Sequence, residues 1–293
     1  MIHTAPHVIR VLSQNLHQPA PRILKSLRTA VETVRPDLLL LQNIDRPVGE
    51  LQVAELTQGL GFEMAIAPTG GGGSNLVAWH PAVFQAKEVD VPEVERLEAG
   101  FGYCAVELSL CDIHHPYPLS AISCALSRYS APRAAQQAQQ LGEIAHRTGG
   151  LGLIAGAINH LPIGDPPPDW DALPGYRRMA LCKLRTSATE PWTGDDHVAR
   201  VLAAGGMTDV AAYIADLAAT AHCVGLERDR THLRAPTTSE PRGIRADQIH
   251  VTAALTTAIE TCWRPDTAVS SHYAIATEFD LAKFDINAMR TYA

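Results

Sequence analysis

The stretch Pro36-Asp-Leu-Leu-Leu-Leu-Gln-Asn43 places four consecutive leucines between a proline and a polar pair. A short apolar run with turn residues before it predicts a strand that is buried on both faces. The run stops abruptly at Gln42 and Asn43, so we expect two amide side chains at the end of this strand. The upstream segment Ile9-Arg-Val-Leu-Ser-Gln-Asn15 has the same form and also ends in asparagine. The sequence therefore predicts two buried strands that each end in polar side chains.

Polar residues also follow or open three further predicted strands. These segments are Leu153-Ile-Ala-Gly-Ala-Ile-Asn159, Ile244-Arg-Ala-Asp-Gln-Ile249 and Ser270-Ser-His272. In a sheet-based fold, polar side chains at the ends of central strands meet on one rim, where residues distant in sequence can form a pocket. We therefore expect the five segments to build one pocket.

Predicted helices alternate with these strands. Residues 22–34 carry apolar side chains at helical spacing before Pro36, and residues 131–147 form a second helical pattern that closes at Gly149 and Gly150. No internal repeat or linker interrupts the pattern. We interpret residues 1–293 as one domain in which strands and helices interleave, an α/β (α+β) class of fold.

The five segments, taken in order, resemble those of the endonuclease/exonuclease/phosphatase superfamily, which has the deoxyribonuclease I-like fold. Its usual segments read S-x-N, L-Q-E, G-D-x-N, an Arg-Ile-Asp type of strand, and S-D-H. The resemblance extends from about residue 8 to residue 281, nearly the whole chain. It implies a four-layer sandwich of two packed β-sheets flanked by helices. It also implies the family's usual activity, Mg²⁺-dependent phosphoester hydrolysis.

The chain departs from the family pattern where the family has carboxylates. Asn43 stands for the glutamate of L-Q-E, Ala157 for the aspartate of G-D-x-N, and Ser271 for the aspartate of S-D-H. Mg²⁺ is a hard ion that requires anionic oxygen ligands at close range, and an amide, a methyl group and a hydroxyl supply none. We therefore expect no metal cofactor and no conventional Mg²⁺-dependent nuclease activity.

The polar residues that match the family pattern are Asn15, Asn159, Asp247 and His272. In the family, the last two resemble a hydrogen-bonded pair in which the carboxylate orients the imidazole. Such a pair holds the imidazole in one tautomer and suits it to general acid–base chemistry near neutral pH. We predict His272 and Asp247 as the catalytic residues. The predicted substrate-binding residues are Asn15, Asn43, Asn159, Ser271, His17 and Asp45.

Two other interpretations stay open at this stage. The first is a residual phosphodiesterase or nuclease that uses Mg²⁺ or Mn²⁺. In it Asp45, which shares a strand face with Asn43 by two-residue alternation, is a relocated ligand, or His17 and His160 favour a softer metal such as Zn²⁺. The second is a non-catalytic binding protein that keeps the pocket, with the His272–Asp247 pair as an ordinary buried hydrogen bond.

Composition bears on the partners of the protein. The chain has 24 basic and 31 acidic residues, a net charge of −7, and no run of five or more basic residues. This balance favours a small polar molecule over nucleic acid, since nucleic-acid binders usually carry a basic excess. No apolar run reaches the length of a membrane span and the N-terminus lacks a secretory pattern, so we expect a cytoplasmic protein without a membrane partner. The six cysteines lack ligand-like spacing, which indicates buried free thiols. No feature of the sequence indicates an oligomeric state.

Overall fold

The computed structural model describes residues 8–17, 21–92, 101–111, 117–220, 236–237, 243–265 and 270–289. Twelve strands in this part of the chain form two six-stranded sheets. The first sheet has, in spatial order, β11 (Ile259–Trp263), β12 (Ile275–Asp280), β1 (Val8–Asn15), β2 (Leu38–Asp45), β4 (Gly73–Trp79) and β3 (Glu63–Pro68). The second has β5 (Phe84–Asp90), β6 (Gly102–Leu110), β7 (Leu119–Ala125), β8 (Gly152–Ala157), β10 (Asp247–Thr252) and β9 (Met207–Asp209).

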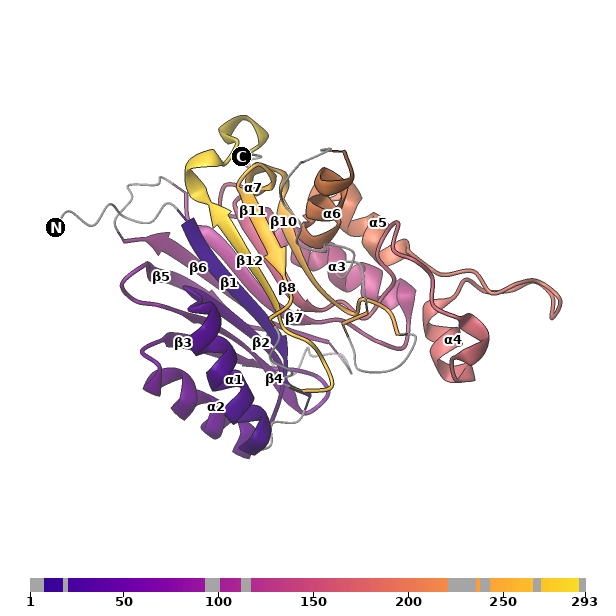
Figure 1. Cartoon of the computed structure of the whole chain (residues 1–293), viewed down its shortest axis with the longest axis horizontal. Coiled ribbons are helices and arrows are strands. Elements are labelled where there is room, and N and C mark those ends of the chain that lie inside the picture. The colour runs from indigo at the N-terminus through magenta and orange to yellow at the C-terminus, as the bar shows by residue number, and fades with distance from the viewer. Residues whose placement is uncertain are drawn as a thin grey trace.

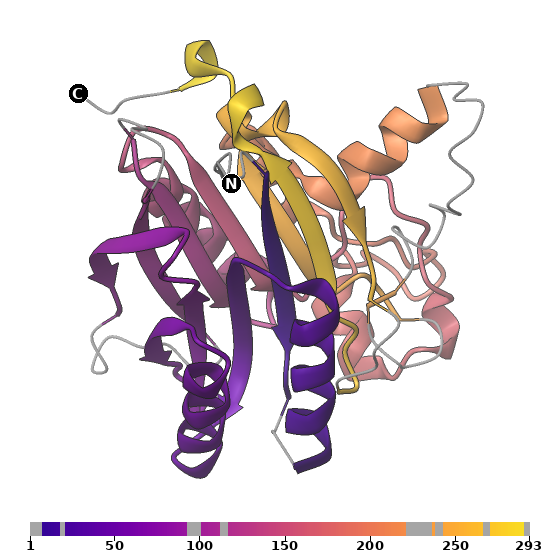
Figure 2. The same cartoon turned by 60° about the vertical axis from the view of Figure 1, so that its left-hand side comes forward.

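Helices cover the outer faces of both sheets (Figures 1 and 2). The helices are α1 (Pro21–Val34), α2 (Val48–Gly59), α3 (Ala131–His146), α4 (Gly175–Leu181), α5 (His197–Ala204), α6 (Val210–Thr220) and α7 (Ala253–Thr256). Helices α1 and α2 pack on the first sheet, whereas α3 and α5 pack on the second. The predicted sandwich of two sheets flanked by helices is confirmed.

The leucine run of β2 shows how the layers are held together. Leu38 and Leu40 point into the core between the two sheets, whereas Leu39 and Leu41 point to the core beneath α1 and α2. All four side chains are at most 1% exposed. Alternate side chains of this one strand therefore pack in two different apolar cores, which is why the run contains no polar residue.

Helix α3 begins where the sequence provides a cap. The Ser130 hydroxyl accepts a hydrogen bond from the Arg133 amide at 3.4 Å, and a proline lies in the first turn. Both features favour a helix start, because the first amides of a helix have no intrahelical acceptor. Ala134, Ala138 and Leu141 then face the second sheet.

The sequence analysis missed the strands β5, β9 and β11 and the helices α4, α6 and α7. Strand β5 lies at a sheet edge with most of its side chains exposed or half-buried, and its sequence contains no apolar run. Strand β11 is also an edge strand and has only five residues. The predicted strand from Ile244 was wrong in its start, since β10 begins at Asp247.

Two further expectations concern thiols and membranes. Four of the five described cysteines are buried as free thiols, Cys111 is exposed, and Cys223 lies outside the described residues. Within the described ranges, no helix combines the length and the apolar character that crossing a bilayer requires.

Gly156 on β8 lies where β8 closely approaches β7. Its φ is +146°, and a Cβ at this position would lie 2.0 Å from the Cys124 carbonyl oxygen of β7. We expect Gly156→Ala to lower the free energy of unfolding by about 3 kcal/mol, because the clash is with backbone that cannot move aside. Urea unfolding measures this change.

Gly142 is the matched control, because it lies within α3 and has open space around its Cα. Gly142→Ala is expected to stabilise the protein by about 0.5–1 kcal/mol through helix propensity. A Gly156→Ala protein as stable as the wild type would contradict the described packing of β7 against β8.

Candidate active site

The predicted polar residues meet at one rim of the sandwich. Strands β1, β2 and β8 end there, and β10 begins there because it runs antiparallel to β8, with Asp247 opposite Ala157. The rim surrounds a cavity of about 470 Å³. Seven of the eight predicted site residues line this cavity: Asn15, His17, Asn43, Asp45, Asn159, Ser271 and His272. Asp247, the eighth, lies behind His272.

His272 and Asp247 form the pair that the sequence predicted. The imidazole Nδ1 lies 2.6 Å from Asp247 Oδ2, and the two side chains are only 13% and 4% exposed. A carboxylate acceptor at this distance assigns the Nδ1 position as the donor, so Nε2 is the basic nitrogen of the neutral ring. The Asp247 amide donates to the Thr237 hydroxyl at 2.9 Å, which fixes the start of β10.

Two asparagines extend this pair across the rim. Asn15 Nδ2 donates to Asp247 Oδ1 at 3.3 Å, and Asn43 Nδ2 donates to Asn15 Oδ1 at 3.0 Å. The resulting chain Asn43–Asn15–Asp247–His272 begins on the first sheet, passes through the second at Asp247 and returns to the first ahead of β12. Both oxygens of Asp247 therefore have a donor, which suits a buried carboxylate.

The backbone at the rim adopts left-handed conformations that non-glycine residues seldom use. His17, Asn43 and Asn159 have φ values of +41°, +54° and +64°. Asparagine and histidine tolerate this region better than most residues, and strained backbone of this kind is frequent at functional sites. At Asn43 the register of β2 with β4 also shifts. Asn43 and Asp45 both line the cavity, but the simple alternation from which we predicted this is interrupted between Leu41 and Ile44, at Asn43 itself.

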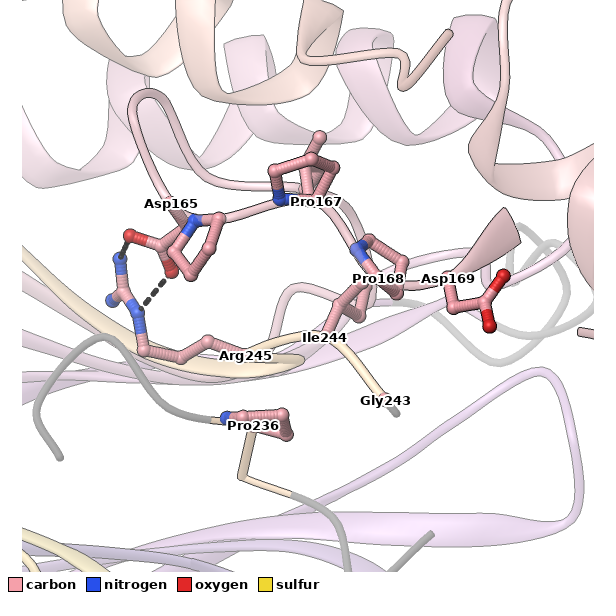
Figure 3. Close-up of a pocket in the computed structure, with 10 residues that line it drawn as sticks. Asp165, Pro167, Pro168, Asp169, Pro236, Gly243, Ile244 and Arg245 are labelled. Atoms are coloured by element: carbon pink, nitrogen blue, oxygen red, sulfur yellow. Dashed lines mark hydrogen bonds and ion pairs between the residues drawn. The ribbon is translucent and has the colours of Figure 1, made fainter. Parts of the chain in front are cut away.

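Arg245 fixes the segment that leads into Asp247. Its guanidinium is 1% exposed and pairs with Asp165 at 2.8 Å and with Asp209 at 2.6 Å. Figure 3 shows Arg245 reaching Asp165 beside the turn that contains Pro167. Burial alone would raise the pKa of Asp209, but the charge of Arg245 and its hydrogen bonds lower the pKa to about 2. No sequence pattern indicates these partners, because Asp165 and Asp209 lie in segments that are distant from Arg245.

The two histidines of the softer-metal interpretation occupy different environments. His17 lies on the cavity wall, with its ring centroid 5.8 Å from that of His272. Burial lowers the pKa of His17, and the nearby charges of His272 and Arg128 lower it further. His160 is fully buried and its Nε2 lies 2.8 Å from the Ser127 carbonyl oxygen. It is not among the residues that line the cavity, so the structure does not bring His17 and His160 together there.

Three residues that the sequence analysis did not single out also line the cavity. Arg128 and Tyr129 follow β7, and Arg177 comes from α4. The Arg128 guanidinium donates to the Tyr129 hydroxyl at 2.6 Å and lies 4.9 Å from the centre of its ring. Arg128 and Arg177 thus add two cations to the lining, and Asp45 is the one carboxylate among the described residues that line the cavity.

The donor set does not fit the divalent ion that the fold family implies. Within the described part of the chain, no group of three His, Cys, Asp or Glu side chains is placed to hold a metal. Asn43 presents an amide that already donates to Asn15, and Ala157 presents a buried methyl group. The carboxylate of Asp247 is engaged by His272 and Asn15. Asp45 alone is a poor site for a hard cation that needs several anionic oxygens.

Comparison with solved structures identifies the architecture. D. rerio TDP2 complexed with a single-strand DNA product aligns with a TM-score of 0.60 and 14% identity, over 93% of this chain and 98% of that one. The human Nocturnin catalytic domain with bound sulfate aligns at 0.58 and 14%, over 94% and 93%. The chain has the deoxyribonuclease I-like fold.

The 3′ phosphatase NExo from Neisseria, bound to a product DNA hairpin, shares this DNase I-like fold at a TM-score of 0.58 and 14% identity, over 92% of this chain and 99% of that one. All three belong to the endonuclease/exonuclease/phosphatase superfamily, so the fold that the five segments predicted is confirmed. No protein-family model and no curated protein sequence matches the chain. At this level of identity the likeness establishes the fold and not an activity.

Because of the Arg245 cluster, we expect the free energy of unfolding to fall at acid pH. Since the pKa of Asp209 is about 2 in the folded state and 3.8 ordinarily, its ionised form stabilises the fold above pH 4. That contribution, about 2 kcal/mol, should be lost as the pH falls from 4 toward 2. Urea unfolding of the wild type and of Asp209→Asn should differ most at neutral pH and converge in acid.

Asp171→Asn is the control for this measurement, since that carboxylate is 91% exposed. Its unfolding curves should follow those of the wild type at every pH. A constant difference between the wild type and Asp209→Asn from pH 7 to pH 2 would contradict the assigned ion pair.

Proposed function

We propose that this DNase I-like chain is an enzyme that acts on a small polar substrate by general acid–base chemistry without a divalent metal. His272 transfers the proton and Asp247 orients it. The observation that carries the proposal is the 2.6 Å contact between the two side chains at the wall of a polar cavity. A buried pair of this kind belongs to a recurrent arrangement in which a carboxylate holds an imidazole for proton transfer.

The proposed role of each group follows from its bonds. With Nδ1 directed at Asp247, His272 uses Nε2 to accept a proton from a hydroxyl group or a water molecule. The imidazolium that forms is stabilised by the adjacent carboxylate, which itself stays ionised. Asn15 is a positioning residue, because its amide links Asp247 to Asn43 rather than reaching the substrate alone.

The remaining polar groups are assigned to substrate binding. Asn159 is held by its Nδ2, which donates to the carbonyl oxygens of Leu126 and Ala157 at 2.9 and 3.2 Å. Asn43, Ser271, His17 and Asp45 keep the substrate-binding role predicted from the sequence, whereas Asn15, predicted with them, is assigned to positioning. A cavity of about 470 Å³ fits a small molecule, within the usual size range of ligand sites.

A residual metal-dependent phosphodiesterase is the second candidate. One observation favours it, namely that Asp45 lines the same cavity as Asn43. It requires the substrate or further groups to complete the coordination of the ion. A binding protein without turnover is the third interpretation and needs no chemistry from His272.

Chelation separates these candidates. We expect hydrolysis of a panel of small esters, amides and phosphodiesters to continue in EDTA, and to fall by about 10²-fold or more in His272→Ala, the usual size of a general acid–base contribution. Asp247→Asn should reduce the rate as well. The matched control is His197→Ala, an exposed histidine at the start of α5.

Single- and double-stranded DNA are assayed beside the panel with Mg²⁺, with Mn²⁺ and with EDTA. Cleavage that needs the metal and disappears with EDTA would overturn the proposal in favour of the second candidate. Turnover that survives in His272→Ala would remove the assigned residue. Absence of turnover under every condition would leave only the binding interpretation.

Rebuilding the family's carboxylates tests the metal assignment without any substrate. We expect Mg²⁺ to leave the Tm of the wild type unchanged and to raise the Tm of the triple variant Asn43→Glu, Ala157→Asp, Ser271→Asp. The rise should be roughly 2–4 °C for each kcal/mol of ion binding. Since Ala157 is buried opposite Asp247, the variant should also be less stable than the wild type in EDTA. An equal Mg²⁺ shift in the wild type would contradict the proposed loss of the metal site.

A further inference from the structure

Helix α4 and the segment that follows it project from the sandwich, at the right of Figure 1. We call residues 175–194 the arm. Its base is closed where Cys182 pairs with Gly194 and where the Lys183 amide donates to the Thr193 carbonyl at 2.9 Å. Leu181 is 2% exposed and belongs to a small core with Leu161. The arm is thus anchored at its base and extends away from the sheets.

The surface of the arm is unusually apolar for a projecting element. Leu184 is 95% exposed, Met179 is 79% exposed and Tyr176 is 68% exposed. Single exposed apolar side chains are ordinary, but three within nine residues of one projection form a local apolar surface.

The same surface is cationic. Residues 175–189 contain four cations, Arg177, Arg178, Lys183 and Arg185, and no acidic residue, although the chain as a whole is −7. Arg178, Lys183 and Arg185 line a hollow of about 360 Å³ beside Met179 and Leu184.

Acidic groups offset part of this charge: Glu190 leaves residues 175–194 with a net charge of +3, and Asp171, Asp195 and Asp196 flank the arm. Asp171 lies 3.8 Å from Arg178 and is itself 91% exposed. Glu190 is held by the Thr186 amide and hydroxyl at 2.7 and 3.0 Å.

The surroundings of Trp192 bear on whether a nucleic acid or an anionic lipid surface fits the arm. The Arg185 guanidinium lies 3.7 Å from the centre of one of its rings, and that of Arg178 lies 5.2 Å away. Cations cover the aromatic surface on which a nucleic-acid base would stack. Two of the three apolar side chains exposed on the arm, Met179 and Leu184, are aliphatic, and lipid chains accept these whereas phosphodiester backbones do not. The third, Tyr176, is aromatic, a residue type that is also enriched at membrane interfaces.

We propose that the arm docks this protein on an anionic lipid bilayer, with Met179 and Leu184 entering the interface and the surrounding cations binding lipid phosphates. Elements that lie on a membrane combine basic and apolar residues in this way, and they need no spanning segment. The sequence predicted no membrane partner because it lacks such a span, a criterion that surface docking does not use. This proposal is independent of the proposed chemistry at His272.

Arg177 gives the orientation that docking would impose. It belongs to the arm and also lines the cavity beside His272. A bilayer in contact with the arm would therefore lie next to one wall of the cavity.

Vesicle flotation tests the proposal with the full chain. We expect the wild type to float with vesicles of phosphatidylcholine mixed with phosphatidylglycerol and not with phosphatidylcholine alone. Raising the salt concentration should release it, since the attraction is largely screened. Lys183→Gln with Arg185→Gln should lower partitioning by about five-fold for each charge removed. Leu184→Asp should lower it further, through loss of apolar insertion.

Matched controls lie on the opposite side of the fold. Leu51→Asp changes a leucine that is 66% exposed on α2, and Lys25→Gln with Arg28→Gln removes two exposed charges from α1. Both proteins should float like the wild type, and far-ultraviolet circular dichroism should show all variants folded.

Three results would overturn the proposal. The first is equal flotation of Leu184→Asp and the wild type. The second is failure of the wild type to float with anionic vesicles at low salt. The third is binding of a single-stranded oligonucleotide, without vesicle binding, that depends on Lys183 and Arg185, because this would assign the arm to nucleic acid instead. Flotation of His272→Ala should equal that of the wild type, which separates this test from that of the catalytic proposal.

Discussion

The burial of two apolar sheet faces against each other is the constraint on which the rest of this molecule depends. Leu38 and Leu40 from the first sheet and Leu153 and Val251 from the second belong to one core and are at most 1% exposed. Each fully buried side chain of this size contributes roughly 1.5–3 kcal/mol relative to exposure. Because the sheets are held face to face, strand ends from one lie within hydrogen-bonding distance of strand ends from the other.

Polar groups cross between the sheets near the rim. Gln42 donates to the Ser123 hydroxyl at 3.0 Å, and farther out Asn15 donates to Asp247. A buried amide without a partner costs on the order of 1–3 kcal/mol, so these bonds favour one alignment of the sheets over others. The apolar core brings the sheets together, and the polar bonds select how they meet. The geometry of His272 and Asp247 is a product of both.

The sequence was most informative where a strand is buried and ends in a polar residue. The leucine run predicted β2, because a strand whose two faces are both buried in apolar cores carries no polar residue along that stretch. The convergence of Asn15, Asn43 and Asn159 followed from the positions at which their strands end. The sequence was least informative about contacts between segments that lie far apart in the sequence and about very short elements. Nothing local to Arg245 indicates Asp165 or Asp209, and α4 is too short to show periodicity. The left-handed turn at Asn43 also has no distinct pattern, although asparagine permits it.

Arg177 has a consequence for how the two ends of the molecule influence each other. Its backbone lies in α4 at the root of the projection and its side chain forms part of the cavity wall. Thermodynamic reciprocity applies to any such shared group. Consider a ligand in the cavity that repositions Arg177 and so changes the affinity of the arm for a surface. Attachment of the arm to that surface must then change the affinity of the protein for the ligand by the same factor. A single side chain can in this way make occupancy of an interior site and attachment at the periphery one coupled equilibrium.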